Sequence, residues 1–540
     1  MNRNFTRLLT IILLMVALAG FRSTTQAQTA GIYEGYVIID INGGGNAYYD
    51  LGAATSNPDF QGASLGTFTI GTNTLTLKGA QNKTFKCSGG DVTGGDGFYR
   101  IYKVGNTPGS FTSSGAMGFV SNDAGGCGGN QTWEKSNASI NVLSGLAPGN
   151  YQLEVYNRAS TNVGDQFDNN GGANYIASFT VAASTSNPVV VTSSGGTAFA
   201  TYATLAASFS AINAGTHTGI IAITVGNNTT EPAAGAILNA SGAGSASYTS
   251  ISVQPFGNVT ISGTATAGLP LVDFNGADNV TVNGLNTGGN TLTISNLSTS
   301  STSGTSTIRF QTDATNNSIT NCSVLGSATM STGTNGGNIW FGSAAITTGN
   351  DNNTISNCDI GPAGTNLPSK CIYFSGSSNN EPGTANSGIT ITNNNIFNYF
   401  NASSSSAGID LNSGSLGVTI SNNKFYQTAS RTMTSTGLTH SGIRISNSAA
   451  VATYSITGNT IGFASSNGTG FYTLVFPSTT SAAFLPINLS VGVNTPTTVQ
   501  NNIIAGIAMS GAASGTSSSA PFRGIYVASG LATCNTNTIG

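Results

Sequence analysis

In residues 271–540, short stretches of alternating apolar and polar residues recur in pairs. The first stretches are LVDF (271–274), TIRF (307–310), NIWF (338–341), CIYF (371–374), GIDL (408–411), GIRI (442–445), PINL (486–489) and GIYV (524–527). The second are SITNC (318–322), TISNC (354–358), TITNN (390–394), TISNN (419–423), SITGN (455–459), TVQNN (498–502) and TCNTN (533–537). A fixed unit followed by segments of variable length is typical of a solenoid, so we expect each unit to form one coil with two or three strands.

Residues two apart on a strand share a face, so the apolar positions of the repeat should form columns through the stacked coils. One inward column consists of Val272, Ile308, Ile339, Ile372, Ile409, Ile443, Ile487 and Ile525. A second consists of Phe274, Phe310, Phe341, Phe374, Leu411, Ile445, Leu489 and Val527. A third column, of asparagines, is expected at a turn where side-chain amides hydrogen-bond between coils; its members are Asn394, Asn423, Asn459, Asn502 and Asn537.

Two cysteines, Cys322 and Cys358, share one column and lie one coil apart. Neighbouring coils are close enough for a disulfide on Cα distance alone. Because parallel side chains point the same way, a stack of reduced thiols is the equal alternative.

Residues 28–184 carry no internal period. Alternating runs such as YQLEVY (151–156) follow turn signals such as Pro-Gly-Asn (148–150), which is typical of an antiparallel β-sandwich. Cys87 and Cys127 are the cysteines of this part, and we expect a disulfide between them.

Residues 185–188 (Thr-Ser-Asn-Pro) predict a linker, and a helix is expected at about residues 199–213. Its apolar residues fall at helical spacing, and a solenoid needs an element that shields its first core layer from water. The predicted fold is therefore all-β. An N-terminal antiparallel β-sandwich (28–184) is followed by a right-handed parallel β-helix (189–540) with an N-terminal cap helix.

The first 27 residues have the pattern of a signal peptide. Arg3 and Arg7 precede an apolar run at residues 8–20, and small residues surround a cleavage position after Ala27. The run is shorter than the roughly 20 apolar residues of a membrane span, and we expect no span after cleavage. These features predict a secreted or cell-surface protein.

Composition agrees with strands and turns outside the cell. Charged residues make up 6% of the chain, Gly counts 72, and hydrophobic residues reach 38%. Polar positions filled by hydroxyl and amide residues instead of charged ones are typical of strands and turns. The recurring apolar residues argue against a disordered chain. The net charge of −3 gives no electrostatic basis for nucleic acid as a partner.

The [ST]-[IV]-x-N-[NC] and GI-x-[FLIV] stretches resemble the parallel β-helix repeats of pectate-lyase-like and related bacterial surface proteins. The segment TYATLAASFSAINAGTHTG (201–219), followed by these repeats, is similar to large extracellular β-helix proteins exported by the type IX route. That resemblance implies a C-terminal sorting domain, whereas this chain stops within a coil at Gly540. We therefore expect a truncated C-terminal end.

Between the two inward columns lies an outward one, which gathers aromatic and charged residues on one sheet face. Its members are Asp273, Arg309, Trp340, Tyr373, Asp410, Arg444, Asn488 and Tyr526. Aromatic rings beside charged and amide groups suit a sugar-binding groove. The alternative is that stacked rings and Asp/Arg pairs stabilise the ladder of strands. The sequence leaves both interpretations open.

A polysaccharide lyase or glycoside hydrolase would need acids on the same face. Asp273 and Asp410 are four coils apart, roughly 19 Å at the strand spacing, whereas a glycosidase pair needs about 5 to 9.5 Å. His440, expected on a loop, could meet Arg444 and Asp410 and act as a general base. The simpler expectation is that the His440 side chain lies in solvent and has no catalytic role.

Two further functions have weaker signals. Serines and threonines flank the inward residue of each second stretch, as Thr390 and Thr392 do, and such hydroxyl columns are what an ice-binding solenoid presents; irregular loops and Gln500 interrupt that lattice. Asp165 and Asp168 lie in a Gly-rich acidic turn that suits Ca²⁺, although an ordinary turn explains it equally well. No other cofactor is expected.

The sequence thus favours a non-catalytic secreted or cell-surface protein for adhesion or glycan binding, with an extracellular polysaccharide or surface glycan as partner. Its ligand face would be the outward column, together with loops that should emerge along one edge of the solenoid. These loops are residues 326–337, 397–407, 428–441 and 462–485. A β-helix lyase or hydrolase, an ice-binding protein and a purely structural surface protein are the alternatives.

Overall fold

The computed structural model describes residues 29–52, 55–125, 129–342, 348–376, 383–476, 482–511 and 520–540. The chain forms two compact units, the first built mainly from residues up to Thr180 and the second from Val181 onward. The expected signal peptide (1–27) and Cys127 lie outside the described residues. No described helix is long and apolar enough to cross a bilayer.

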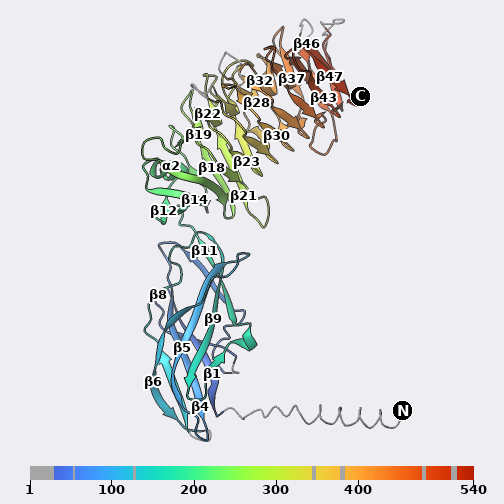
Figure 1. Ribbon diagram of the computed structural model, residues 1–540. Helices are drawn as coiled ribbons and strands as arrows, with labels where there is room; N and C mark the ends of the chain where they lie inside the picture. The colour runs from blue at the N-terminus through green and yellow to red at the C-terminus, as the bar shows by residue number, and fades with distance from the viewer. Residues whose placement is uncertain are drawn as a thin grey trace, which may run out of the picture. The chain divides into compact units, whose positions relative to one another are not determined.

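The first unit consists of antiparallel strands in one continuous run of pairs, β2-β1-β4-β7-β6-β5-β9-β11-β3 (Figure 1). Their bounds are β1 (Ala30–Ile41), β2 (Ala47–Asp50), β3 (Ser64–Thr69), β4 (Leu75–Lys86), β5 (Val92–Lys103), β6 (Thr112–Asp123), β7 (Asn130–Lys135), β8 (Ile140–Asn141), β9 (Gly149–Thr161), β10 (Gln166–Asp168) and β11 (Tyr175–Ala182). The buried Asn157 amide on β9 donates to the Tyr36 carbonyl of β1 and to Asn82 Oδ1 of β4. These bonds join β9 to strands with which it does not pair.

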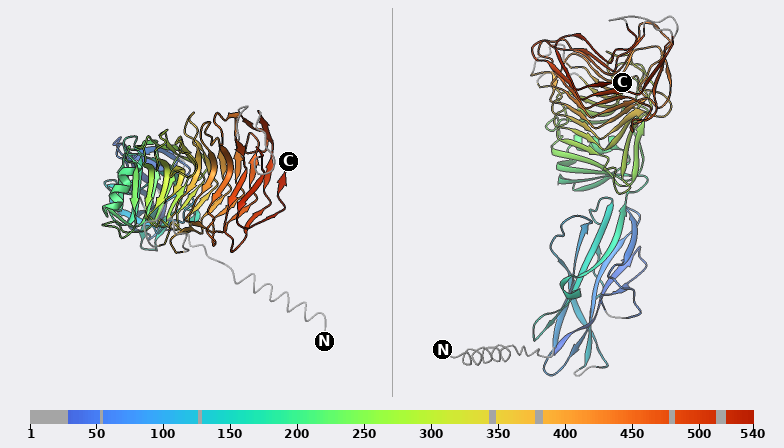
Figure 2. Two further views of the ribbon diagram at one scale, coloured as in Figure 1. Left: turned by 90° about the horizontal axis from the view of Figure 1, so that it is seen from above. Right: turned by 90° about the vertical axis from the view of Figure 1, so that its right-hand side faces the viewer.

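The second unit is a parallel β-helix, and each coil adds one strand to each of three sheets (Figure 2). The first sheet contains β12 (Val189–Gly196), β13 (Phe199–Tyr202), β14 (His217–Val225), β17 (Tyr248–Pro255), β20 (Val280–Asn283), β23 (Ser318–Thr320), β26 (Thr354–Ser356), β30 (Thr390–Thr392), β34 (Thr419–Ser421), β38 (Ser455–Thr457), β43 (Thr497–Gln500) and β47 (Ala532–Asn535). The second contains β15 (Thr229–Thr230), β18 (Asn258–Gly263), β21 (Thr291–Asn296), β24 (Cys322–Gly326), β27 (Asp359–Pro362), β31 (Asn395–Phe397), β35 (Lys424–Tyr426), β39 (Thr460–Gly462), β44 (Ile503–Ala505) and β48 (Thr538–Ile539). The third contains β16 (Ala236–Asn239), β19 (Pro270–Asn275), β22 (Ser306–Gln311), β25 (Gly337–Phe341), β28 (Lys370–Phe374), β32 (Ser406–Leu411), β37 (Thr439–Ser446), β42 (Ile487–Ser490) and β46 (Ile525–Ser529).

Both inward columns are confirmed by the register of the third sheet, in which Ile308 pairs with Ile339 and Phe310 with Phe341. The phenyl rings of the second column stack, with centroids 4.7 Å apart for Phe310 and Phe341 and 4.4 Å for Phe341 and Phe374. One apolar cluster runs through the unit from Val189 to Ile504. The core therefore arises from contacts between like residues of neighbouring coils.

The asparagine column is also confirmed. Asn423 Nδ2 donates to Asn459 Oδ1 of the next coil at 3.0 Å and to the Ile391 carbonyl of the previous coil at 2.9 Å. Its own oxygen accepts from both nitrogens of Asn394. Cys358 donates its backbone N–H to Asn394 Oδ1, so the two cysteines continue this column as free thiols.

The helix α2 (Leu205–Asn213) is shorter than the predicted 199–213, because residues 199–202 form β13 and pair with β12. Thr204 caps its first turn, and the Glu231 carboxylate accepts from the N–H groups of Leu205 and Ala206. Leu205, Phe209 and Ile212 are buried and belong to the apolar cluster of the coils.

The long connections between the second and third sheets leave from one edge of the solenoid, as predicted, since each joins a strand of the second sheet to the next strand of the third. Several of these connections contain short strands of their own. A small three-stranded parallel sheet forms among them from β36 (Arg431–Thr432), β40 (Tyr472–Val475) and β45 (Ile507–Ser510), and β41 (Ala483–Phe484) pairs with β37.

Candidate functional site

The register of the third sheet places the predicted outward residues in one column. Successive Cα partners run from Asp273 through Arg309, Trp340, Tyr373, Asp410, Arg444 and Asn488 to Tyr526. The alternation of the strands was therefore assigned correctly from the sequence.

The expectation that this face is open was wrong for four of its residues. Asp273, Trp340, Tyr373 and Asp410 are 2%, 8%, 1% and 0% exposed. The segment 327–336, predicted as part of an edge loop, bonds instead to this face. We call residues 327–336 the covering segment.

The covering segment is bonded to the sheet through Gly333. Its N–H donates to Asp410 Oδ2 at 3.0 Å, and its carbonyl accepts from the Tyr373 hydroxyl at 3.0 Å. The Lys370 ammonium donates to the carbonyls of Ser331 and Thr334. Backbone groups of the segment thereby satisfy side chains that the sequence alone places in solvent.

Each acid of the column is paired with the arginine of the next coil. Arg309 donates Nε and Nη2 to the two oxygens of Asp273 at 2.9 and 2.6 Å, and Arg444 Nη1 donates to Asp410 Oδ1 at 2.6 Å. These pairs agree with the interpretation that Asp/Arg pairs in the outward column stabilise the ladder of strands. A carboxylate held in this way is poorly placed for acid–base chemistry on a substrate.

Lys370 is a buried charge that sequence reasoning missed. It is 1% exposed, and its ammonium lies 3.9 Å from the centroid of the Tyr373 ring. Burial lowers the pKa of Lys370 to about 8, although Asp410 opposes that shift. Lysine is almost never fully buried without partners, and nothing in the local sequence indicates that carbonyls from the covering segment supply them.

The proposed meeting of His440 with Arg444 and Asp410 was also wrong. His440 belongs to β37 rather than to a loop and is fully buried. Its ring nitrogens contact Ser406 Oγ at 2.7 Å and the Tyr472 hydroxyl at 2.6 Å. Burial, with a smaller effect of Arg431, lowers the pKa of His440 to about 3. The long connections fold into an aromatic cluster that encloses the imidazole, which therefore cannot serve a substrate as a base.

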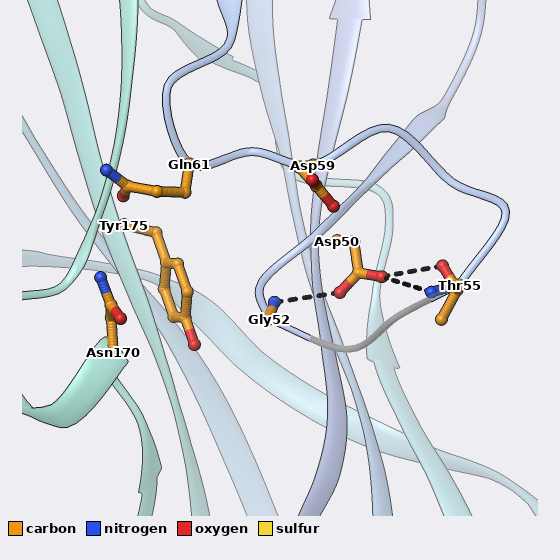
Figure 3. A pocket seen from close by; sticks show the side chains of 7 residues that line it. All are labelled: Asp50, Gly52, Thr55, Asp59, Gln61, Asn170 and Tyr175. Carbon is orange, nitrogen blue, oxygen red and sulfur yellow. Dashed lines mark hydrogen bonds between the residues drawn. The ribbon is translucent and has the colours of Figure 1, made fainter.

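An open pocket of about 600 Å³ lies in the first unit. Figure 3 shows its lining, with the Tyr175 ring on one side, Asp50 and Thr55 on the other, and Asp59 and Gln61 on the loop that follows Thr55. Its full lining is Asp50, Gly52, Thr55, Asp59, Gln61, Asn170 and Tyr175. Sequence reasoning missed this pocket because its residues come from segments more than a hundred positions apart.

The two walls of the pocket are held by internal hydrogen bonds. Asp50 Oδ1 accepts from the Gly52 N–H, and Oδ2 accepts from the Thr55 N–H and hydroxyl at 3.2 and 2.8 Å. Behind the opposite wall, the Tyr175 hydroxyl donates to Asp168 Oδ1 at 2.6 Å. Burial raises the pKa of Asp168 to about 6, with a further contribution from the charge of Asp50. Asp59, Gln61 and Asn170 line the pocket with exposed side chains.

Asp165 and Asp168, the two candidate Ca²⁺ ligands of the sequence, bond to different side chains. Asp165 is exposed and pairs with Arg158 at 3.1 Å, whereas Asp168 is bonded to Tyr175. The described residues contain no group of three or more His, Cys, Asp or Glu side chains that could hold a metal ion. Cys87 is disulfide-bonded, and its pairing with Cys127 stays a prediction because Cys127 lies outside the described residues.

No family model and no curated protein matches this sequence. Among solved structures, similarity extends to PfbA, a surface adhesin of Streptococcus pneumoniae, at 12% identity and a TM-score of 0.26 over 62% of this chain and 86% of that one. The Agl-KA catalytic domain follows at 12% identity and 0.23, over 87% and 88% of the chains. A GH87 α-1,3-glucanase catalytic domain in complex with nigerose matches at 11% identity and 0.18, over 85% and 93%. TM-scores this low carry no inference about function.

Proposed function

We propose that this chain is a secreted or cell-surface protein that binds an extracellular glycan without transforming it, and that the pocket beside Tyr175 is its ligand site. The observation that carries the proposal is the lining of that pocket. Exposed carboxylate and amide groups of Asp59, Gln61 and Asn170 surround a hollow whose wall includes the largely buried Tyr175 ring. Sugars present hydroxyls that such carboxylate and amide groups can bind.

The outward column of the third sheet is the weaker candidate for the ligand site. Its central residues bond to one another and to the covering segment, which leaves Arg309, Arg444, Asn488 and Tyr526 as its partly exposed members. A lyase or hydrolase would need free acids, but the acids of this column are already paired with arginines. We therefore interpret the column as a network that stabilises the sheet.

A glycan array probed with the full chain tests the proposal. Asp59→Ala combined with Asn170→Ala should weaken binding to the retained glycan by about tenfold or more, which corresponds to the loss of about 1.4 kcal/mol. The control Asp165→Ala removes another exposed carboxylate of the same unit, outside the pocket, and should bind normally.

Two outcomes would contradict this proposal. Binding that survives the pocket variants but disappears in Trp340→Ala would move the site to the third sheet. Release of reducing ends or unsaturated uronic-acid products from the bound glycan would show that the protein is an enzyme.

A further inference from the structure

The outward face of the first sheet is an array of hydroxyl groups. The register aligns two columns on it, and each strand from β20 to β38 in this sheet contributes one residue to each column. The first column is Thr281, Ser318, Thr354, Thr390, Thr419 and Ser455; the second, one inward residue further along each strand, is Asn283, Thr320, Ser356, Thr392, Ser421 and Thr457. Both columns hold a hydroxyl residue in each of the five strands β23, β26, β30, β34 and β38.

The same coils place other chemistry on their other faces. An outward column of the second sheet runs through Thr293, Ser323, Asp359, Asn395, Lys424 and Thr460, and that of the third sheet mixes acids, arginines and aromatic rings. Strands in general favour threonine, but that preference acts on all three sheets alike. The uninterrupted run of hydroxyls therefore belongs to one face and is not a general property of the strands.

The array is rigid and regular. Ile319, Ile355, Ile391, Ile420 and Ile456 lie between the two columns on the inner side, and each is fully buried. Neighbouring hydroxyls also bond between coils, Ser356 to Thr320 at 3.0 Å and Ser421 to Thr392 at 2.9 Å. Coils repeat at about 4.8 Å, and residues two apart on a strand lie roughly 6.6 Å apart.

The connections that leave the first sheet for the second are short. The longest described connections join the second sheet to the third. The first sheet passes to the second through short corners, formed by an asparagine with φ near 55° at Asn321, Asn357, Asn393 and Asn422 and by Gly458 after β38. Gln500 lies in β43, beyond the five regular strands.

We propose that this hydroxyl array binds the surface of ice. An ice face presents oxygen atoms at fixed repeats of a few ångströms in two directions, and it is uncharged. The array offers donors and acceptors at comparable repeats in two directions, it carries no ionic group in the ten aligned positions, and its threonine methyl groups limit competing disordered water. A polyanion would require basic residues, and a stacked sugar would require aromatic rings. This site is separate from the pocket of the first unit and does not depend on its function.

Ice recrystallisation and thermal hysteresis, measured with the full chain, test the proposal. The protein should slow the growth of ice grains and hold a gap between melting and freezing. The double variant Thr390→Tyr and Thr419→Tyr places two bulky rings on adjacent coils in the centre of the array and should abolish both effects.

The matched control is Thr293→Tyr with Thr460→Tyr, which adds the same rings at equally half-buried threonines of the second sheet. It should retain both activities, and circular dichroism should show both double variants folded. Failure of the folded wild-type chain to differ from an inert protein of similar size would overturn the proposal. So would equal loss in both variants, or a glycan ligand whose binding is lost only in the Thr390/Thr419 variant.

Discussion

At the scale of single residues, the asparagine column shows how a buried polar group can organise a fold. Asn423 is completely buried, yet its oxygen accepts two N–H groups and its Nδ2 makes two hydrogen bonds. A buried polar group that loses its partner costs much more than an ordinary hydrogen bond contributes. Each asparagine therefore fixes the relative height of three successive coils.

Asn423→Ala should lower the free energy of unfolding by about 3 kcal/mol, because the Asn394 backbone N–H and the Ile391 carbonyl lose the Asn423 amide and Asn394 Nδ2 keeps only its bond to the Ile355 carbonyl. Denaturant unfolding of the full chain measures the change. The control Asn422→Gly, at a neighbouring position with φ of 56°, should change stability little, since glycine adopts this conformation freely. Equal losses in both variants would contradict the role assigned to the amide.

At the scale of elements, the covering segment and the third sheet stabilise each other. Backbone groups of the segment make hydrogen bonds to the side chains of Asp410, Tyr373 and Lys370. In return, these side chains hold in place a segment that has no regular secondary structure. The strand that carries Asp410 and the segment that contains Gly333 are far apart in sequence. Their bond connects coils that are not direct neighbours along the chain.

Asp410→Ala should accelerate amide hydrogen exchange in residues 327–336, most of all at Gly333, and lower stability by about 1 to 3 kcal/mol, because the Gly333 N–H loses its acceptor and Arg444 keeps only Asn412. Hydrogen exchange read by mass spectrometry resolves this segment. Asp273→Ala breaks the matching pair with Arg309 and should lower stability without faster exchange in residues 327–336. Unchanged exchange in Asp410→Ala would show that the segment is held by other contacts.

Sequence reasoning succeeded where contacts are repeated and failed where they are not. The columns of Ile308 and Phe310 follow from period and alternation, because every coil packs against a copy of itself. The burial of His440, the covering of Asp410 and the pocket beside Tyr175 depend instead on connections with no period. Their partners lie at unrelated positions of the chain, and no local pattern predicts those pairings.

At the scale of the whole molecule, the two units should respond oppositely to acid. The pKa of Asp168 is about 6 in the folded first unit against 3.8 ordinarily, so its contribution to stability is present at low pH and lost as pH rises to 6. The pKa of His440 is about 3 in the folded second unit against 6.5. Its contribution is present above pH 6.5 and is lost as pH falls toward 3.

Between pH 7.5 and pH 5, Asp168 should stabilise the first unit by about 1 kcal/mol and His440 should destabilise the second by about 2 kcal/mol. Calorimetric scans at the two pH values should show one transition rising and the other falling. Asp168→Asn should abolish the rise and leave the fall unchanged. Two transitions that move together in the unaltered chain would refute this assignment.

The short asparagine corners also affect how such a protein changes in length. Successive coils turn at the same kind of corner, as at Asn357 and Asn393, and bond chiefly to the coils on either side. One such coil could therefore replace another without changing how it joins its neighbours. Duplication or loss of the gene segment for one coil would therefore lengthen or shorten the hydroxyl face by about 4.8 Å and leave the register of the remaining strands intact. The size of that face is open to selection in whole steps, independently of the first unit.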